Sequence, residues 1–274
     1  MVIDRQTLLR NVAYYGKGDW NTEFAIIKEK KRFTDEELNE CNIQCKTPCI
    51  VIGEREYPDY FRETPQPPIA LFYYGNKDLL SDKYIRVSVV GTRNPNHYST
   101  KYTEDFLEEL IKTIDNIVIV SGMAYGIDSI AHRLAMKYNK PTIAVMGNGI
   151  DRYYPNNSKD IYEYCSSGKG LVVSEYPCMV EPLAEHFPPR NRIIAAMADL
   201  IFIPEAKDKS GTSITLRYAL QMGKTICCLP QRVDDFQLTN NAIKDGAYLI
   251  NSAKDIKNLL PKKFDKKEYL AEIE

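Results

Sequence analysis

The sequence has almost no net charge and no long apolar segment. Its 36 lysines and arginines are balanced by 37 aspartates and glutamates, which gives a formal charge of −1. The chain therefore lacks the overall attraction to nucleic acid of a strongly basic domain, and a bound anion must be held by a local patch. No run of about 18 apolar residues is present, and the first residues lack the apolar core of a signal peptide. We therefore expect a protein that does not enter a membrane.

Histidine is also scarce, with three residues, whereas cysteine is not, with seven. An odd, scattered set of cysteines is typical of a reducing compartment rather than of a disulfide scaffold, so we expect a cytoplasmic protein. Cys41, Cys45 and Cys49 are closely spaced and raise the alternative of a zinc site. A structural zinc site normally needs four nitrogen or sulfur ligands, and no fourth one lies nearby in the sequence. We therefore expect no metal and interpret these cysteines as small buried residues.

Two common phosphate-binding motifs are missing as well. The sequence contains neither the GxGxxG pattern of dinucleotide-binding folds nor the GxxxxGK[ST] pattern of P-loop ATPases. A conventional dinucleotide or ATP site is therefore poorly supported. We expect no cofactor.

From about residue 86 onward, short apolar segments alternate regularly with helical patterns. Strands that are apolar throughout and separated by helices indicate a parallel sheet with both faces covered. We predict an α/β protein whose residues 48–260 form an extended Rossmann-like, doubly wound, mostly parallel sheet. Residues 1–47 are predicted to form a small helical N-terminal appendage, in which Thr34 and Glu37 have the spacing of a capping box. Residues 261–274 are predicted to be a charged C-terminal tail.

Glycine, serine and threonine gather in the turns that follow the predicted strands, as at Gly91, Gly122 and Ser210. The carboxyl ends of parallel strands meet at one edge, where ligands bind near the point at which strand order reverses. Any one of these glycines is best explained by a tight turn. Several at one edge favour a phosphate-binding surface, because glycine lets backbone N–H groups approach an anion. Arg93 lies at the same edge and offers a planar donor fork that suits phosphate.

A catalytic centre is not evident in these turns. Asp128 and His132 share one face of a predicted helix, but a packed or ion-paired couple is the favoured interpretation. Glu175 and Glu205 end predicted strands, and neither has a matching base or acid beside it in the sequence. We therefore predict no catalytic residues and no enzyme.

Six motifs occur in order, and together they form a specific signature: VSVVGTRNPNHYS, IVSGMAYGIDSIAH, TIAVMGNGIDRYYPNN, VVSEYP, HFPPRNRIIAAMADLIFIPEAKDKSGTSITLRYALQMGK and NAIKDGAYLI. They resemble the DNA-processing protein A family (DprA/Smf) over about residues 57–250. The resemblance implies a homodimer that binds single-stranded DNA without cutting it. It also implies a function in natural transformation and DNA recombination, in which the protein protects incoming strands and helps to load the RecA recombinase.

The resemblance assigns a set of DNA- and phosphate-binding residues. Arg93 matches the arginine of the family's G-S/T-R turn, which contacts DNA phosphates. The others match the glycine-rich edge, the F-P-x-R-N-R motif and the S-G-[ST] turn: Gly91, Thr92, Ser121, Gly122, Gly126, Arg190, Asn191, Arg192, Ser210, Gly211 and Thr212. Asn156 belongs to the same set, but it stands where the family usually has a basic residue, so we expect weaker binding and a flatter salt dependence.

Two further positions depart from the family pattern, because Ser99 and Gln231 replace glycines. The C-terminal winged-helix domain of many relatives is also not expected. Four tyrosines close to the predicted edge are candidates for stacking on bases, although packing in the core or at an interface is expected for most of them: Tyr98, Tyr125, Tyr153 and Tyr154.

An alternative is a Rossmann-like nucleotide-binding sensor or nucleotide hydrolase similar to the LOG group. Members of that group carry P-G-G-x-G-T-x-x-E, whose glutamate is catalytic. In the comparable turn of this chain, Gly211 and Thr212 are followed by Ser213, Ile214 and Thr215. The glutamate is therefore missing, which disfavours this alternative.

Arg190 and Arg192 raise a question of charge, because both lie in the first turn of a predicted helix. A helix N-terminus carries a partial positive charge and favours acidic side chains. The two cations suit this position if an anion binds between them and the helix. We therefore expect at least one arginine to face a DNA groove and the other to pair with a carboxylate of Glu175, Glu181 or Glu185.

Overall fold

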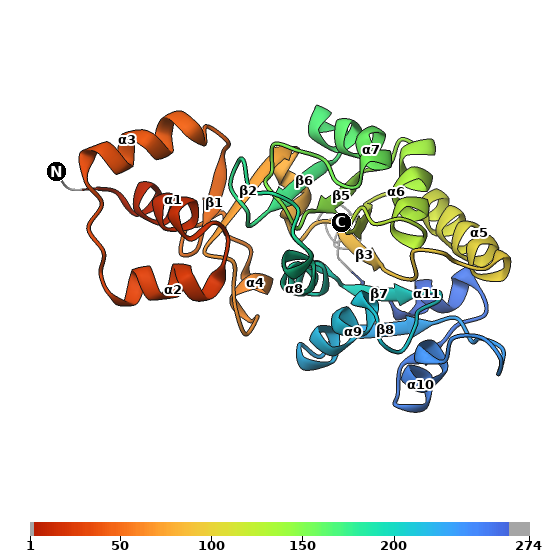
Figure 1. Cartoon of the computed structure of the whole chain (residues 1–274). Helices are drawn as coiled ribbons and strands as arrows, with labels where there is room; N and C mark the ends of the chain where they lie inside the picture. Colours follow the sequence, from red (N-terminus) through yellow and green to blue (C-terminus); the bar gives the residue numbers. More distant parts are fainter. Residues whose placement is uncertain (1–2, 263–274) are drawn as a thin grey trace, which may run out of the picture.

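Short strands, most of them buried along their whole length, form the centre of the molecule. They are β1 (Cys49–Val51), β2 (Ala70–Gly75), β3 (Ile85–Val89), β4 (Ile117–Ser121), β5 (Thr142–Val145), β6 (Leu171–Ser174), β7 (Leu200–Ile203), β8 (Thr225–Cys228) and β9 (Tyr248–Leu249). The computed structural model describes residues 3–262, and within them these nine strands form one sheet (Figure 1). Residues 263–274, most of the predicted C-terminal tail, lie outside the described residues.

The strand order is β1-β2-β6-β5-β4-β3-β7-β8-β9. The pairs from β6 through to β9 are parallel, whereas β2 runs antiparallel to β6 and β1 antiparallel to β2. The chain builds outward from β3 to β6, returns to the other side of β3 with β7, and continues to β9. Strand order therefore reverses between β3 and β7, as in a doubly wound fold.

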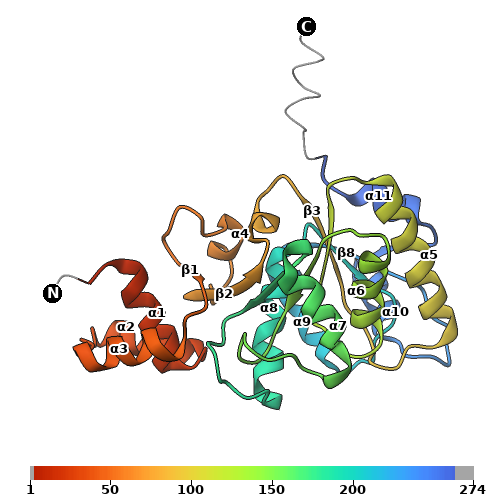
Figure 2. The same ribbon diagram turned by 90° about the horizontal axis from the view of Figure 1, so that it is seen from above.

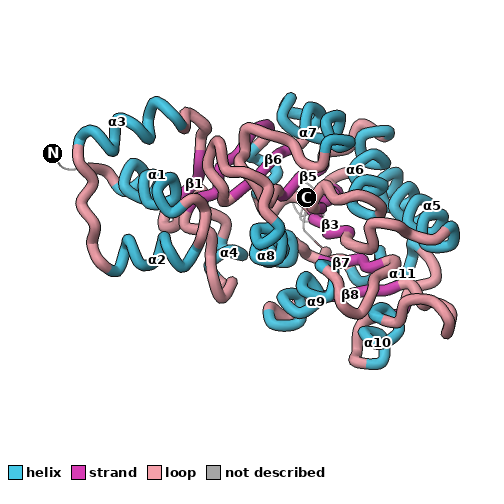
Figure 3. The backbone as a smooth tube through the Cα atoms, viewed as in Figure 1, coloured by secondary structure: helices cyan, strands magenta, loops and turns pink. Residues whose placement is uncertain are grey.

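Helices cover both faces of the sheet. Their bounds are α1 (Arg5–Gly16), α2 (Trp20–Lys28), α3 (Asp35–Gln44), α4 (Asp59–Arg62), α5 (His97–Thr113), α6 (Ile127–Lys137), α7 (Lys159–Tyr164), α8 (Phe187–Met197), α9 (Gly211–Gln221), α10 (Leu238–Lys244) and α11 (Ala253–Leu259). One apolar core joins the strands to α4, α8, α9 and α10, and a second joins them to α5, α6 and α11. Figure 3 shows these helices around the strands. The predicted extended Rossmann-like α/β fold is confirmed.

The N-terminal helices α1–α3 lie beside β1 at one end of the sheet (Figure 2). Leu9 and Val12 of α1 pack in one apolar cluster with Val51 and Phe72 of the first two strands. The predicted capping box starts α3, since the Thr34 hydroxyl accepts from the backbone N–H of Glu37 and the Glu37 carboxylate accepts from that of Thr34. Helical character over this segment is confirmed, and its division from the rest at residues 47 and 48 stays a prediction. None of the described helices is long and apolar enough to cross a membrane.

A buried carboxylate lies at the junction between this helical segment and the sheet. Glu23 on α2 is 2% exposed, and its Oε1 atom has no hydrogen-bond partner among the described residues. Burial raises the pKa of Glu23 well above its usual value, and the negative charge of Glu175 raises it further. The positive charge of Arg192 acts in the opposite direction. The ionised form of Glu23 therefore destabilises the attachment of α2.

Replacing this carboxylate by an amide, in Glu23→Gln, is expected to stabilise the fold at neutral pH. Because the pKa is raised on folding, the contribution of Glu23 to stability is fully present below its unfolded pKa of about 4.3 and is lost as pH rises above it. We expect the free energy of unfolding to increase by about 1–2 kcal/mol at pH 7.5 and to change little at pH 4. Urea unfolding at both pH values measures this. An equal effect at the two pH values, or a loss of stability at pH 7.5, would contradict it.

Candidate nucleic-acid interface

The carboxyl ends of β3 to β8 lie along one edge of the sheet. We call the surface formed by the loops after these strands the rim, and it comprises residues 90–96, 122–126, 146–158, 175–186, 204–210 and 229–237. The rim includes the loops after β3 and β7, the two neighbouring strands at which strand order reverses. In open parallel sheets this is the usual place for a ligand.

Two hydrogen bonds hold the loop after β3 against the loop after β7. The backbone N–H of Thr92 donates to the carbonyl of Glu205 at 2.8 Å, and that of Asn96 donates to the Glu205 carboxylate at 2.9 Å. Glu205 is 2% exposed, so its carboxylate braces a loop and does not face solvent. Arg93 lies between these two anchors, is exposed, and forms no hydrogen bond or ion pair within residues 3–262. A free guanidinium therefore stands at the reversal point.

Gly126 lets the loop after β4 pack directly on the loop after β3. Its φ of +72° lies in the left-handed region that side chains disfavour. A Cβ at this position would lie 2.3 Å from the carbonyl oxygen of Thr92 and 2.6 Å from the carbonyl carbon of Arg93. Glycine is therefore required here by the contact between the loops, which fixes the backbone on either side of Arg93.

Arg190, in the first turns of α8, is 5% exposed and joins three loops of the rim from inside. Its guanidinium donates to the carbonyl of Gly122 after β4, at 2.9 Å, and to the carbonyl of Val145 at the end of β5. Its Nε donates to the side chain of Asn191 at 3.1 Å, and Asn191 donates onward to the carbonyl of Gly211 at 3.0 Å. A Cβ on Gly122 would lie 2.6 Å from this guanidinium, so the glycine makes room for the arginine.

A buried carboxylate balances this cation. The Asp128 carboxylate accepts a hydrogen bond from the backbone N–H of Gly122 at 3.1 Å and is 5% exposed. Burial lowers the pKa of Arg190 to about 10, whereas Asp128 acts in the opposite direction. Arg93 also lowers the pKa of Arg190, so the exposed arginine lies within electrostatic range of the buried one. Arg190 is therefore charged at neutral pH, beneath the surface that carries Arg93.

Arg192 is 1% exposed and forms a two-pronged ion pair with Glu175 at the end of β6. Its Nη1 donates to Oε2 of Glu175 at 2.6 Å, and its Nε donates to the carbonyl of Gln66 at 2.7 Å. This pair connects α8, β6 and the segment before β2. The prediction that one arginine pairs with Glu175 is confirmed.

The prediction that the other arginine faces a groove is wrong, because Arg190 is as deeply placed as its neighbour. The backbone carbonyls at the ends of β4 and β5 accept its donors, and these acceptors take the place that we expected an anion to fill. Arg190 and Arg192 therefore shape the rim from within, while Arg93 supplies positive charge on its surface.

The remaining predicted site residues divide into buried and exposed groups. Ser121, Thr92 and Thr212 are buried, and the Ser121 hydroxyl donates to the carbonyl of Val89 at 2.6 Å. Asn156 and Gly211 are exposed, and Gly91, Gly126 and Ser210 are half-buried. The structure thus brings Gly122, Arg190, Asn191 and Gly211 into one hydrogen-bonded network.

Three exposed cations on the rim were missed by the sequence analysis: Lys207, Lys209 and Arg232. The two lysines directly precede the Ser210 turn, and none of the three forms an ion pair with a described residue. The nitrogen of Lys207 lies 4.7 Å from the ring centre of Phe236. The two lysines could have been predicted from the segment PEAKDKSGTS, because it places both of them directly after a buried strand, at the edge where ligands bind.

The four tyrosines close to the rim are solvent-exposed, by 38–46%. Tyr125 directly precedes Gly126, and Tyr98 lies in the first turn of α5. Tyr154 stacks on Phe187 with ring centres 5.5 Å apart. Burial in the core is therefore wrong for all four, whereas packing at an interface, the other half of the expectation, stays a prediction.

The alternative catalytic and metal residues are not arranged as a reactive site. His132 is fully buried, its Nδ1 lies 2.7 Å from the hydroxyl of Thr142, and burial lowers its pKa to about 3. Asp128 binds backbone N–H groups instead of His132. Glu175 and Glu205 are both held in buried contacts. Within residues 3–262, no group of three histidine, cysteine or acidic residues could hold a metal ion.

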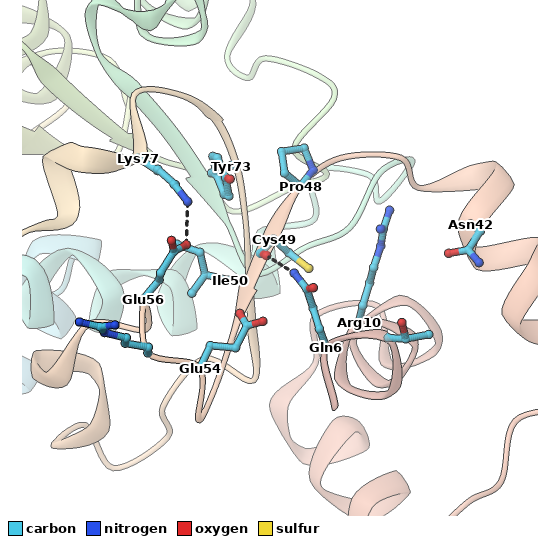
Figure 4. A pocket seen from close by; sticks show the side chains of 12 residues that line it. Gln6, Arg10, Asn42, Pro48, Cys49, Ile50, Glu54, Glu56, Tyr73 and Lys77 are labelled. Carbon is cyan, nitrogen blue, oxygen red and sulfur yellow. Dashed lines mark hydrogen bonds and ion pairs between the residues drawn. The ribbon is translucent and has the colours of Figure 1, made fainter. Parts of the chain in front are cut away.

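Two hollows differ in their relation to the rim. One, of about 560 Å³, lies between the loops after β3 and β8: Asn96, His97, Tyr98, Pro230, Gln231, Arg232 and Asp235 line it. The other, of about 520 Å³, lies between α1 and β1, where Arg10, Cys49 and Lys77 are among its lining residues (Figure 4). The first is part of the rim, whereas the second belongs to the junction with the N-terminal helices.

Comparison with known proteins places this architecture in a family. A match to the family described as DNA recombination-mediator protein A covers residues 48–261. DNA processing protein DprA of Streptococcus pneumoniae is 38% identical over 214 residues, which span 77% of this chain and 73% of that protein. Protein Smf of Synechocystis sp. is 36% identical over 221 residues, which span 79% of this chain and 54% of that protein.

Solved structures agree with these matches. The X-ray structure of DprA from Streptococcus pneumoniae has a TM-score of 0.77 and 32% identity, with 95% of this chain and 94% of that chain covered. A structure of DNA processing protein A from Helicobacter pylori, described as revealing a single-stranded DNA binding mode, has a TM-score of 0.67 and 31% identity, with coverage of 77% and 95%.

The doubly wound sheet and its rim define an extended Rossmann-like protein of the DNA-processing class. The chain belongs to the family of DNA recombination-mediator protein A, whose relatives carry the names DprA and Smf. The resemblance carried by the six motifs is thereby confirmed.

Replacing the buried guanidinium by an apolar chain of similar length, in Arg190→Met, is expected to destabilise the fold. The carbonyls of Gly122 and Val145 would lose their donor, and Asp128 would lose its counter-charge. We expect the free energy of unfolding to fall by about 2–4 kcal/mol, as measured by urea unfolding. Arg217→Met, on the exposed face of α9, is the matched control and should change it by less than about 0.5 kcal/mol. Equal stability of the two variants would contradict the internal role of Arg190.

Proposed function

We propose that this chain binds single-stranded DNA along the rim, without a chemical step, and that Arg93 supplies the central phosphate contact. The observation that carries the proposal is the position of Arg93, which is exposed, without an ion-pair partner in the described part of the chain, and fixed at the reversal point by Thr92 and Gly126. The single-stranded DNA binding mode described for the Helicobacter pylori protein supports it.

In this proposal the predicted site residues have two different roles. Arg93, Asn156, Ser210 and Gly211 are accessible and contact the strand, with Lys207 and Lys209 as additional cations. The buried members and the two half-buried glycines hold the loops in place: Gly91, Thr92, Ser121, Gly122, Gly126, Arg190, Asn191, Arg192 and Thr212. Exposed tyrosines beside the cations supply stacking surfaces, the combination that single-stranded DNA-binding proteins use.

The wider role that we propose is that of a recombination mediator. The chain would protect incoming single strands during natural transformation and help to load a RecA-type recombinase, as a homodimer in the cytoplasm. The proposed DNA-binding unit is residues 48–260, with residues 1–47 as a helical appendage. The family match over residues 48–261 supports the assignment of DNA binding to this unit.

Removing the exposed charge, in Arg93→Ala, is expected to weaken DNA binding without unfolding the chain. Loss of one charge-assisted phosphate contact should raise the Kd for a labelled thymidine oligonucleotide about tenfold at low salt. The slope of log Kd against log salt should fall by about 0.7, the value for one phosphate of a single strand. Fluorescence anisotropy at several salt concentrations measures both quantities.

The control for this variant removes one positive charge at the opposite edge of the sheet. Lys137 is exposed and ends α6, a helix that begins at the rim. Lys137→Ala should therefore leave Kd and salt slope nearly unchanged. Equal losses in the two variants would indicate a diffuse charge effect, and absent or salt-insensitive binding by the unaltered chain would overturn the proposed function.

Tyr125→Ala tests stacking separately from charge. Tyr125 is 46% exposed and adjoins Gly126, whose backbone packs against Arg93. If a base stacks on its ring, the loss should be about 1–3 kcal/mol, which raises Kd about 5–150-fold and leaves the salt slope unchanged. Tyr125→Phe keeps the ring and should retain affinity. A variant Tyr125→Ala that binds as tightly as the unaltered chain would exclude this tyrosine from the interface.

A further inference from the structure

Two cysteines far apart in the sequence meet between the N-terminal helices and the rim. Cys45 directly follows α3, and Cys178 lies in the loop after β6. Their sulfur atoms are 3.5 Å apart, although 133 positions separate them along the chain. Cys45 is fully buried, whereas Cys178 is half-buried and therefore reachable by a small solute.

Two hydrogen-bonding side chains converge on the sulfur of Cys178. The thiol of Cys45 donates to it, and the hydroxyl of Thr47 lies 3.0 Å from it and 2.7 Å from the hydroxyl of Tyr74. The hydrogen bond from Cys45 is the main reason why the pKa of Cys178 is lowered to about 6, against the opposing effects of burial and of Asp151. The hydrogen bond thus favours the thiolate at Cys178 over the thiolate at Cys45.

The remaining cysteines do not share this environment. Cys41, Cys49, Cys165, Cys227 and Cys228 are buried, and burial raises the pKa of each. Among the described residues, no other pair of cysteine sulfur atoms is joined by a hydrogen bond. A thiolate is the reactive form of cysteine, so reactivity is concentrated at one pair.

The backbone next to this pair is also unusual. Met179 has φ of +72°, in the left-handed region, and its N–H donates to the carboxylate of Asp151 at 2.9 Å. The neighbouring carbonyl of Val180 accepts from the N–H of Gly149 at 2.8 Å. The loop that carries Cys178 is therefore fastened to the loop after β5, in which the exposed Tyr153 lies.

We propose that Cys45 and Cys178 form a reversible disulfide, with a hydroperoxide as oxidant, that fastens the end of α3 to the loop after β6. The Cys178 thiolate attacks one oxygen of hydrogen peroxide, the O–O bond breaks, and the departing hydroxide takes up a proton to become water. The thiol of Cys45 then attacks the sulfur of the resulting sulfenic acid. The S–S bond forms, the S–O bond breaks, and the released oxygen leaves as a second water with the thiol proton. Two thiols and one peroxide thus give one disulfide and two waters.

This modification would add a covalent link between two parts of the chain that now touch through non-covalent contacts. A cross-link between residues 45 and 178 would hold the helical segment against a loop of the rim, and reduction by a dithiol would release it. Reversible disulfides of this kind are the usual form of disulfide in a reducing compartment. The disulfide would form whether or not the chain binds DNA.

The test treats the reduced full-length chain with a small excess of hydrogen peroxide and then alkylates free thiols under denaturing conditions. We expect two of the seven thiols to be lost, and mass spectrometry of a non-reduced digest to find one peptide pair, joining Cys45 to Cys178. Dithiothreitol should restore both thiols. The oxidised chain should melt about 5–10 °C higher, because the cross-link restricts the unfolded chain.

Three variants separate the roles of the two sulfur atoms. Cys178→Ser should consume peroxide at least about tenfold more slowly, whereas Cys45→Ser should stop at a sulfenic acid that dimedone traps on Cys178. Cys228→Ala removes a buried thiol elsewhere and should form the cross-link normally. Thiol counting and mass spectrometry on the unaltered chain test the proposed disulfide even if a variant fails to fold. Seven free thiols after peroxide, a pairing of Cys178 with another cysteine, or a bound zinc ion that protects these thiols would overturn the proposal.

Discussion

The rim depends on one buried cation. The guanidinium of Arg190 lies inside the sheet edge. Parallel strands end there and leave carbonyl groups without a partner on the next strand. Its guanidinium donates to the carbonyls of Gly122 and Val145, and Asn191 extends the contact to Gly211. Unpaired carbonyls buried at this edge would destabilise the fold, and a planar cation with several donors satisfies more than one of them at once. The three loops are therefore positioned before any ligand arrives.

Buried contacts also explain why two arginines occur in the first turns of α8, where the helix dipole disfavours cations. An unfavourable interaction with the helix dipole is worth only fractions of a kcal/mol to about 1 kcal/mol near a surface. The buried contacts of Arg190 with carbonyls and of Arg192 with Glu175 are individually stronger, since charge-assisted hydrogen bonds contribute about 1.5–3 kcal/mol each. The tertiary contacts of the two arginines thus outweigh the preference of a helix N-terminus for acidic side chains. An anion is not needed to account for the two charges.

Periodicity was sufficient to predict the sheet, because strands such as β4 are buried on both faces and contain no polar residue until Ser121. The pairing of Arg192 with Glu175 was also predictable, since both residues were expected at the same edge. The burial of Arg190 was not, because sequence does not indicate which strand-end carbonyls lack partners. The exposure of Tyr125 was not predictable either, because the sequence does not indicate whether an aromatic ring in a turn reaches the core. The contact of Cys45 with Cys178 depends on how the helical segment docks, which no local pattern encodes.

Two departures from the family pattern prove to be neighbours. The side chain of Gln231 donates to the hydroxyl of Ser99 at 3.0 Å and to the carbonyl of Pro204 at 2.8 Å. Each departure adds atoms where the resemblance predicts glycine, and the added atoms bind each other, so neither leaves a buried polar group without a partner. The loops after β3, β7 and β8 are joined in this way. A side-chain hydrogen bond at these two positions therefore holds the loops together where the family has flexible glycines. Lys207 and Lys209 place positive charge at the reversal point, whereas Asn156 adds none to its own loop.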